Sequence, residues 1–389
     1  MSLYAKQMIN IFIPLFAIHC MEQVYFIYGT VLQQYKLGPE IIGWLLSSYF
    51  IAIMCIRPLG GWLLERFGIR RTLIGAGVLG FAGCSVLFFA RGVPLLLLGR
   101  LLSGASFGIY GVGIFSYQAI TLPTKIRGAA FSLLASGGLL PLATITPLGE
   151  WLLLKGHAQA YLSLGPLCAL ACVYFGSKVG SSPAVTKPKR EDWGNYGELL
   201  IYRPYLVVLA SGALMALIDA SVVCMSLLAA ERGLVASFFL TASAVTGALV
   251  RVAGSKAVGH LPRMITLSPV SVCMGVGLFA VALYPSNRVF MWGGALFGVG
   301  IGIGWPVYLS LIADILPSAL RPKGTAVGLL VYDTGWIITP LITGYFMSVF
   351  GTAWSFRILS LAGVCAALAI HILYWVPLYR KTKRQEAVL

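Results

Sequence analysis

A short charged stretch between two long apolar segments constrains the fold of this chain more than any other feature. Residues 57–71 (RPLGGWLLERFGIRR) bring together arginines, one acid and three glycines. A weaker copy lies 194 residues later, where Arg251 matches Arg57 and Gly254 matches Gly60. A charged connection that recurs at half the chain length predicts two related halves built from membrane-length helices.

The composition predicts an integral membrane protein. Apolar residues make up 59% of the 389 residues, charged residues make up only 10%, and the mean hydropathy is +0.88. About 20 apolar residues cross the hydrocarbon layer as a helix, and apolar runs without alternation favour helices over a barrel. We expect an all-α protein with twelve transmembrane helices in two pseudo-symmetric six-helix bundles. The expected spans are 9–33, 41–64, 72–90, 93–118, 128–153, 160–179, 203–229, 235–257, 265–284, 288–313, 324–350 and 353–377.

The placement of the basic residues predicts the orientation. The formal net charge is +16, which by itself would fit a nucleic-acid partner. Most Lys and Arg, however, fall in alternate connections and in the tail, on the side that holds both termini. This is the positive-inside pattern, so we expect both termini in the cytoplasm, a lipid bilayer around the protein and no nucleic-acid partner. The sequence has no Asn-x-Ser/Thr sequon, which is consistent with a bacterial, multi-pass inner-membrane protein.

One polar segment divides the chain. Residues 180–200 are rich in Pro, Gly and charge, which is typical of a linker. We expect an N-terminal bundle at 1–179, a cytoplasmic linker at 180–202, a C-terminal bundle at 203–379 and a basic cytoplasmic tail at 380–389. Further matches support the repeat: Gly104 and Gly108 pair with Gly298 and Gly302, and a two-residue insertion later brings Gly128 onto Gly324.

The hinge between spans 2 and 3 resembles the signature of the major facilitator superfamily. Residues 61–71 (GWLLERFGIRR) are similar to that family's Gly-x-x-x-Asp-Arg-x-Gly-Arg-Arg motif, with Glu65 in place of the Asp. Arg100, followed by Gly104, resembles the second motif of the family in span 4. The resemblance covers essentially the whole chain and implies two bundles that rock around a central cavity. The exporter motif of span 5 is only loosely matched, by Gly137, Gly138, Pro141 and Gly149, which leaves both export and uptake open.

The resemblance also implies a cytoplasmic gate. In it, Glu65, Arg66 and Arg70 hold the cytoplasmic side shut in one state, with Gly61 and Gly68 from the same motif. The alternative is that these residues are ordinary membrane anchors, an interpretation that we favour for Arg71. Arg57 and Arg251 are twins in the repeat, and we expect them to support the two hinges.

Three acids lie inside apolar spans: Glu22 in span 1, Asp219 in span 7 and Asp333 in span 11. A charged side chain at mid-membrane costs about 2.5–3.5 kcal/mol on insertion scales, so such acids indicate proton or substrate sites. His19 lies three residues before Glu22, where it could hydrogen-bond to it or exchange protons with it. Spans 1 and 7 correspond in the repeat, so Glu22 and Asp219 are expected to face the central cavity. For each acid the alternative is a hydrogen bond that joins two helices.

One cation and several aromatic residues complete the expected cavity. Arg100 is expected as a partner of Glu22 or of an anionic group of the substrate. The expected aromatic lining consists of Tyr25, Phe26, Trp305, Tyr332 and Trp336. Tyr332 and Trp336 are four residues apart and are expected to form one aromatic wall beside Asp333. Glu150 and Asp314 fall near the ends of spans, where solvation reduces the cost of their charge.

These features predict a secondary transporter that works by alternating access: a proton-coupled exporter (antiporter) of a small organic solute such as a drug, metabolite or siderophore. The alternatives are a proton-coupled uptake symporter for an organic acid, amino acid or sugar, and a membrane enzyme or channel. The sequence shows no nucleophile–base set, metal-ligand cluster or ATP-binding loop, so we expect no catalysis, metal or cofactor. We expect the transporter to be a monomer.

Overall fold

The apolar segments form long helices in the computed structural model, which describes residues 3–121, 134–180, 196–253, 261–317 and 320–386. Within these ranges, ten helical segments are long and apolar enough to cross a membrane, and two shorter apolar helices lie at Leu140–Leu154 and Ser237–Ala253. The expected all-α fold of twelve membrane helices is thereby confirmed. Residues 128–133 of the fifth expected span, 254–257 of the eighth, and 181–195 of the expected linker lie outside the described residues.

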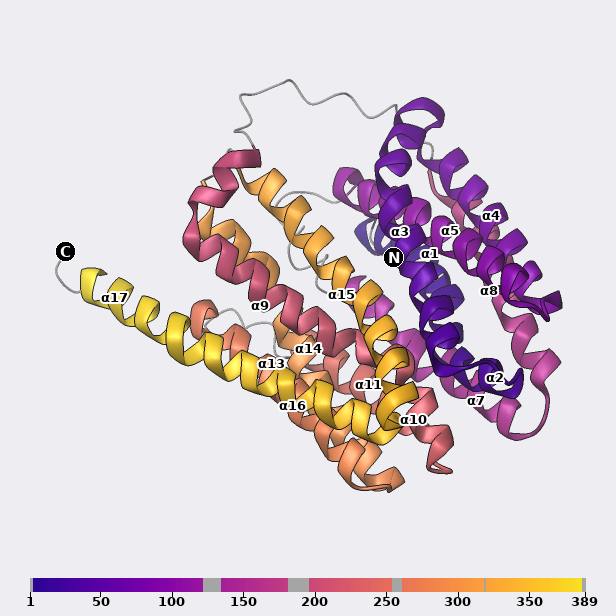
Figure 1. Ribbon diagram of the computed structural model, residues 1–389. Coiled ribbons are helices and arrows are strands. Elements are labelled where there is room, and N and C mark those ends of the chain that lie inside the picture. Colours follow the sequence, from indigo (N-terminus) through magenta and orange to yellow (C-terminus); the bar gives the residue numbers. More distant parts are fainter. Residues whose placement is uncertain (1–2, 122–133, 181–195, 254–260, 318–319, 387–389) are drawn as a thin grey trace.

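Each half of the chain forms one bundle (Figure 1). The N-terminal half contains α1 (Leu3–Gln23), η1 (Val24–Ile27), α2 (Tyr28–Gln34), α3 (Pro39–Phe67), α4 (Ile69–Phe89), α5 (Val93–Thr121), η2 (Ser136–Gly138), η3 (Leu140–Ala143), α7 (Ile145–Leu154) and α8 (Ala158–Lys178). The C-terminal half contains η4 (Tyr196–Ile201), α9 (Arg203–Asp219), η5 (Ala220–Cys224), α10 (Met225–Glu231), α11 (Ser237–Ala253), α13 (Arg263–Leu283), α14 (Asn287–Ile315), α15 (Arg321–Phe350), α16 (Thr352–Ile370), η6 (His371–Trp375) and α17 (Val376–Glu386).

The helix lengths follow the sequence repeat. Helices α4 and α13 have 21 residues each and begin 194 positions apart. Helices α5 and α14 have 29 residues each and also begin 194 positions apart. The two halves are therefore pseudo-symmetric copies of one arrangement, as the repeated hinge predicts.

Spans 1 and 7 are each interrupted by a tight 3-10 turn. Turn η1 separates α1 from α2, turn η5 separates α9 from α10, and the two turns are in contact. Glu22 lies one residue before the end of α1, and Asp219 is the last residue of α9. Short 3-10 stretches inside a helix often mark hinges. Both interruptions therefore place an intramembrane acid beside a bend at the interface between the halves.

The halves pack closely toward the end of the molecule that carries α2 and α10. There α3 runs beside α15 (Figure 1). A Cβ atom on Gly43 would lie 2.5 Å from the carbonyl oxygen of Pro340, and a Cβ on Gly344 would lie 2.6 Å from that of Pro39. Only glycine permits so close a backbone approach.

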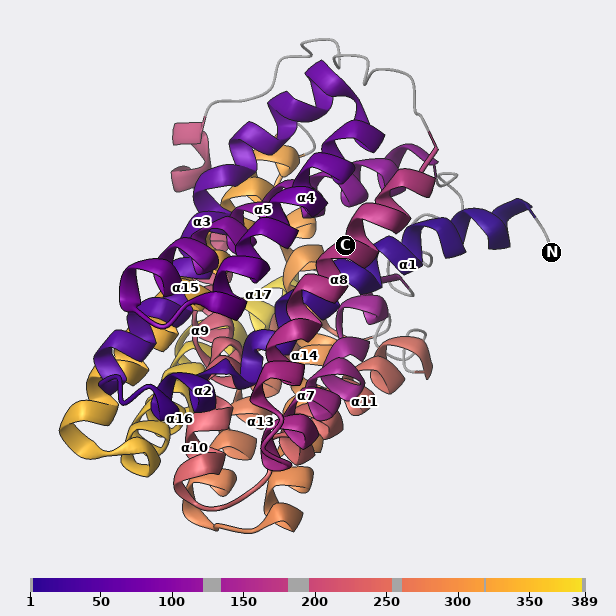
Figure 2. The same cartoon turned by 90° about the vertical axis from the view of Figure 1, so that its right-hand side faces the viewer.

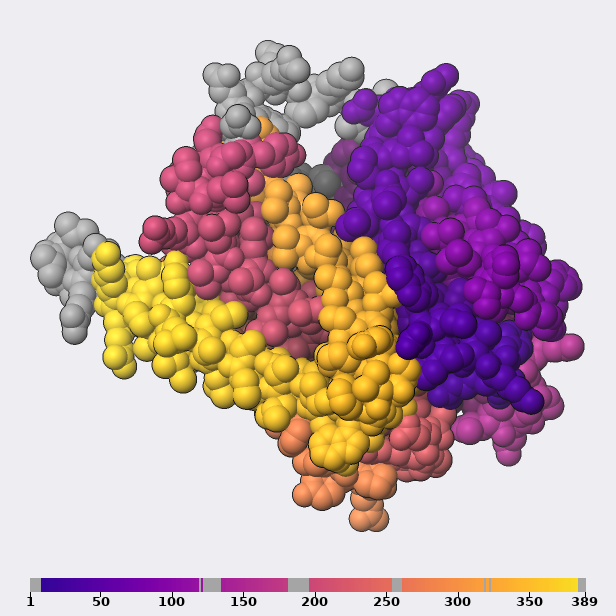
Figure 3. Space-filling view, viewed as in Figure 1, coloured from indigo at the N-terminus to yellow at the C-terminus, as the bar shows by residue number. Residues whose placement is uncertain are grey.

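The opposite end, which carries the linker, is where the halves part (Figure 3). Several hydrogen bonds between the halves lie between mid-span and the α2–α10 end. Examples are Ser47 Oγ to the carbonyl oxygen of Ile337 at 2.7 Å and Ser348 Oγ to Glu40 Oε1 at 2.8 Å. The structure is thus closed at the α2–α10 end.

Candidate functional site

An ion pair joins the halves at mid-span. Arg57 of α3 donates a hydrogen bond from Nη1 to Oδ2 of Asp333 on α15. The Arg57 side chain is 37% exposed and that of Asp333 is 20% exposed, so the pair lies partly in a solvated space. The partner of Arg57 thus belongs to the other bundle, and its expected support of the cytoplasmic hinge stays a prediction.

Glu22 is a buried acid without a partner. It is 9% exposed, and no hydrogen bond or salt bridge to it exists within the described part of the chain. Arg57 and Arg100 lie near enough to interact with it electrostatically. A carboxylate so poorly solvated and unpaired is costly, which favours uptake of a proton or binding of a cation.

His19 is not joined to Glu22. Its Nδ1 lies 2.8 Å from the carbonyl oxygen of Leu15, one turn earlier in the same helix. Its ring packs edge-on against Phe107 at a centroid distance of 5.3 Å. The predicted exchange between His19 and Glu22 therefore has no direct hydrogen bond in this structure.

Arg100 is bound to backbone rather than to an acid. Nε and Nη2 donate to the carbonyl oxygens of Leu45 and Leu46, both at 3.1 Å. Its guanidinium lies 4.6 Å from the ring centroid of Tyr49, and the residue is 2% exposed. The predicted ion pair with Glu22 is not formed, and the described contacts make Arg100 a clamp between α5 and α3.

The aromatic residues fall into two groups instead of one wall. Tyr332 donates from its hydroxyl to Asp219 Oδ2 at 2.9 Å, and its ring lies 4.5 Å from that of Trp305. Trp336 instead crosses to the other half, 6.0 Å from Phe26 and 5.1 Å from Phe50 between ring centroids. The prediction that Tyr332 and Trp336 form one wall is wrong, because they contact different partners.

Tyr25 points away from the interface. Its hydroxyl packs against Gly165 on α8, and its ring meets Tyr28 edge-on at 5.4 Å. Its predicted place in the cavity lining is therefore wrong. Phe50 and Tyr49, which sequence reasoning missed, carry no pattern that separates them from other apolar residues of the span.

The environment of Glu150 differs from the prediction, because its position near the end of a span predicts a solvated acid and the structure buries it. It is 8% exposed and accepts hydrogen bonds from the backbone N–H groups of Ala236 and Ser237 at 2.7 and 2.6 Å. These groups form the N-terminus of α11, whose dipole favours a negative charge. Figure 2 shows α7 and α11 side by side at the α2–α10 end. Glu150 therefore fastens one half to the other.

The predicted gate is open to solvent in this structure. Glu65, Arg66 and Arg70 are exposed, and Glu65 forms no salt bridge among the described residues. The guanidinium of Arg66 lies 5.2 Å from the ring centroid of Trp62. Gly68, with φ 77°, turns the chain sharply from α3 into α4, while Gly61 has open space around it.

Arg251, the twin of Arg57, is buried between three spans. Nη1 donates to the carbonyl oxygen of Ala135 in the N-terminal half at 3.2 Å, and Nη2 donates to that of Ile301 at 3.4 Å. Arg251 thus reaches across the interface, and its expected support of the second hinge stays a prediction.

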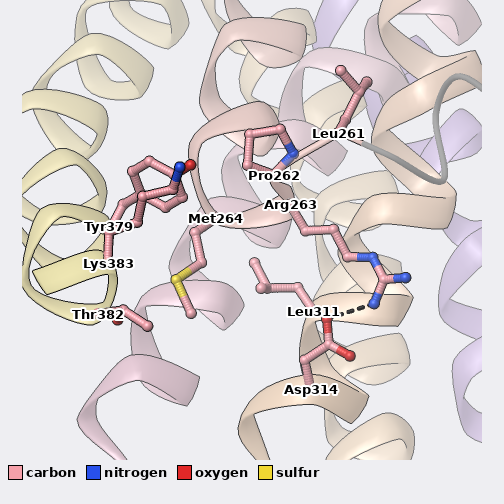
Figure 4. A pocket seen from close by; sticks show the side chains of 9 residues that line it. All are labelled: Leu261, Pro262, Arg263, Met264, Leu311, Asp314, Tyr379, Thr382 and Lys383. Atoms are coloured by element: carbon pink, nitrogen blue, oxygen red, sulfur yellow. Dashed lines mark hydrogen bonds and ion pairs between the residues drawn. The ribbon is translucent and has the colours of Figure 1, made fainter. Parts of the chain in front are cut away.

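A separate pocket lies at the linker end of the C-terminal half, between the start of α13, the end of α14 and α17 (Figure 4). It has a volume of about 400 Å³. Arg263 Nη1 and Asp314 Oδ2 form a salt bridge at its wall, 2.6 Å apart. Asp314 is exposed, as its position near the end of a span predicts. The acid that pairs with Arg263 in the repeated copy of the hinge thus comes from α14. Within the described residues, no group of three or more His, Cys, Asp and Glu side chains could hold a metal ion.

Two halves of apolar, membrane-length helices close at one end on charged and aromatic side chains and part at the other, which defines the class as a multi-helix membrane protein. The family model for the Major Facilitator Superfamily matches residues 1–285 and 209–388. The chain therefore belongs to the major facilitator superfamily.

Relatives of known name transport solutes of several kinds. The chain is 25% identical over 369 residues to facilitated glucose transporter member 6 of Mus musculus, covering 77% of this chain and 73% of that protein. It is 35% identical over 101 residues to probable inositol transporter 3 of Arabidopsis thaliana, covering 24% of this chain. That match spans only 17% of the length of the inositol transporter.

Solved structures confirm the fold. A mutant of the nucleoside transporter NupG matches with a TM-score of 0.81 and 12% identity, covering 95% of this chain and 100% of that chain. The D-xylose-proton symporter matches with a TM-score of 0.74 and 18% identity, covering 93% of this chain and 96% of that chain.

Proposed function

We propose that this protein is a proton-coupled secondary transporter that exports a small organic solute by alternating access. Glu22 carries the proton. The observation that supports this role is its burial at 9% exposure without a hydrogen-bond partner among the described residues. A carboxyl group that can be neutral in one state and charged in the other is what coupling requires.

Arg57 links the proton to the movement of the halves. It lies within electrostatic reach of Glu22 and is hydrogen-bonded to Asp333 of the other half. When Glu22 is protonated, Arg57 interacts with Asp333 alone, and the halves are held together. When Glu22 is charged, the two carboxylates compete for one guanidinium, and the contact between the halves weakens.

The two ends of the protein then alternate. In the described state, Glu150 and the Gly43–Gly344 contact close the α2–α10 end. By the positive-inside rule this end faces away from the cytoplasm, and the parted linker end faces the cytoplasm. The open gate residues Glu65, Arg66 and Arg70 come together when the cycle reverses. The transporter acts as a monomer in the inner membrane.

The proton supplies enough energy for useful export. One charge that moves through 100 mV releases about 2.3 kcal/mol, which sustains a solute gradient of roughly 50-fold. The experiment is a comparison of cells with and without the gene, in which intracellular and extracellular metabolites and sensitivity to toxic compounds are measured. A solute retained inside the deleted strain supports export.

Uptake is the second candidate. It is favoured by the similarity over 369 residues to a protein named as a facilitated glucose transporter. Proteoliposomes separate the two directions, because a symporter moves solute and proton the same way and an antiporter moves them in opposite ways. Failure of the deleted strain to grow on one nutrient would reject the export hypothesis.

A further inference from the structure

The repeat-related arginines Arg57 and Arg251 have unequal partners. Each reaches into the other half: Arg57 to Asp333 on span 11, and Arg251 to Ala135 on span 5. Spans 5 and 11 are themselves counterparts in the repeat. In the alignment that pairs Gly128 with Gly324, Asp333 corresponds to Gly137. The position that supplies a carboxylate to Arg57 thus supplies none to Arg251.

Arg251 is buried without an anion. It is 9% exposed, its two hydrogen bonds to carbonyl oxygens are long at 3.2 and 3.4 Å, and its Nε has no partner among the described residues. Asp219 interacts with it electrostatically, but the two form no salt bridge, and Oδ2 of Asp219 accepts a hydrogen bond from the Tyr332 hydroxyl instead.

The sequence next to Arg251 and Ala135 supplies no further acid that could pair with Arg251. Residues 122–133 and 254–260, which lie outside the described part, contain neither Asp nor Glu. The salt bridges of the described residues are Arg57 with Asp333 and Arg263 with Asp314, so neither involves Arg251. A buried guanidinium is normally paired, which makes an external anion the missing partner.

We infer that Arg251 binds a carboxylate of the transported solute in the space between the halves. The inference rests on the proposed function and names the class of solute. A guanidinium presents a planar fork of N–H donors that matches a carboxylate, and the free Nε with one Nη forms such a fork. Bound carboxylate would replace weak bonds to two carbonyl oxygens. Glu22 offers an unpaired acid on the other half, so a solute with both a carboxylate and a cationic group satisfies both sides.

The test uses two pairs of probes that differ only in the carboxylate. Phenylacetate is compared with phenylacetamide, and phenylalanine with phenylalaninamide. Aromatic probes are chosen because Asp219, which interacts with Arg251, is hydrogen-bonded to Tyr332, and the Tyr332 ring contacts that of Trp305. Binding to purified protein is measured by the shift in melting temperature and by tryptophan fluorescence. We expect wild type to bind the carboxylates more tightly than the amides. Arg251→Gln should weaken carboxylate binding by about 10-fold or more, as for loss of a charged hydrogen bond, and leave amide binding unchanged.

Two further variants complete the design. Arg251→Lys keeps the charge without the fork, so it should retain part of the carboxylate affinity even where Arg251→Gln folds poorly. Arg288→Gln makes the same change at an exposed arginine and should bind like wild type. Equal carboxylate affinity in wild type and Arg251→Gln overturns the inference. So does a wild type that binds no carboxylate, or that binds the amides equally well.

Binding and proton coupling are separated by Glu22→Gln. If this variant still transports in response to a proton gradient, the proposed coupling fails while the carboxylate result stands. If coupling holds but Arg251→Gln binds carboxylates normally, only the assignment of Arg251 fails.

Discussion

Glu150 and Ser237 connect the two halves at the closed end, where Oε2 of the acid lies 2.6 Å from the backbone nitrogen of Ser237. The neighbouring N–H of Ala236 binds the other carboxylate oxygen at 2.7 Å. One side chain thereby satisfies two of the free N–H groups at the start of α11. This contact must break whenever the α2–α10 end opens.

Glu150→Gln should shift the protein toward a state that is open at this end. The amide has one acceptor oxygen and no charge, so it loses one of the two hydrogen bonds. A charged hydrogen bond contributes about 1.5–3 kcal/mol, which predicts about a 10-fold or larger change in the ratio of open to closed forms. Spin labels at Lys155 and Glu231, with Cys55 and Cys365 replaced by Ser, would measure the distance between the halves. Arg288→Gln, at an exposed side chain, is the control. Identical distance distributions for Glu150→Gln and wild type would refute the role.

Glu22→Gln should uncouple solute movement from protons. The amide is permanently neutral, so the exchange of bound solute across the membrane continues while proton-driven accumulation is lost. Proteoliposomes with a trapped pH indicator measure both quantities in one preparation. Proton movement that still accompanies solute in the variant would exclude Glu22 as the carrier.

Asp333→Asn should reduce transport because it leaves Arg57 without its carboxylate. Exchange of the charges, with Arg57→Asp and Asp333→Arg together, should recover part of the rate. Coupling energies between residues in contact are about 0.5–3 kcal/mol, so the double variant should be more stable than the sum of the single changes predicts. The melting temperatures of wild type, Arg57→Asp, Asp333→Arg and the double variant give this coupling. Additive effects of the two single changes would contradict it.

Gly43→Ala should hold the α2–α10 end open. The added Cβ would lie 2.5 Å from the carbonyl oxygen of Pro340, so α3 and α15 must separate. We expect a folded protein with slow transport and a longer distance between the Lys155 and Glu231 labels. Gly75→Ala is the matched control, since nothing lies within 4 Å of its Cβ position. Normal transport by Gly43→Ala would show that the close contact is dispensable.

The sequence predicts the helices well because hydrophobic length is a local property. The span that begins at Val93 was expected at 93–118 and the structure has α5 at Val93–Thr121. The 3-10 turn at Val24–Ile27 is different, because its apolar residues suit a continuous helix and its four buried side chains pack against helices distant in the sequence.

Partners across the interface could not be predicted in the same way. Arg57 and Arg251 share a sequence context, yet one meets an acid and the other meets a backbone carbonyl. Glu150 sits at the end of a span, where local reasoning assigns it to solvent. The partner of each of these side chains depends on which helix of the opposite half lies beside it. A short stretch of sequence does not specify this neighbour.

The unequal arginines also bear on how a duplicated transporter diverges. A symmetric dimer of two C-terminal halves would face each Arg251 with an Asp333, which balances its charges. A dimer of two N-terminal halves would face each Arg57 with Gly137, so neither arginine would meet a carboxylate across the interface. The N-terminal half therefore needs an unlike companion, because the carboxylate that joins Arg57 to the opposite half is Asp333, and the matching position of the N-terminal half is Gly137.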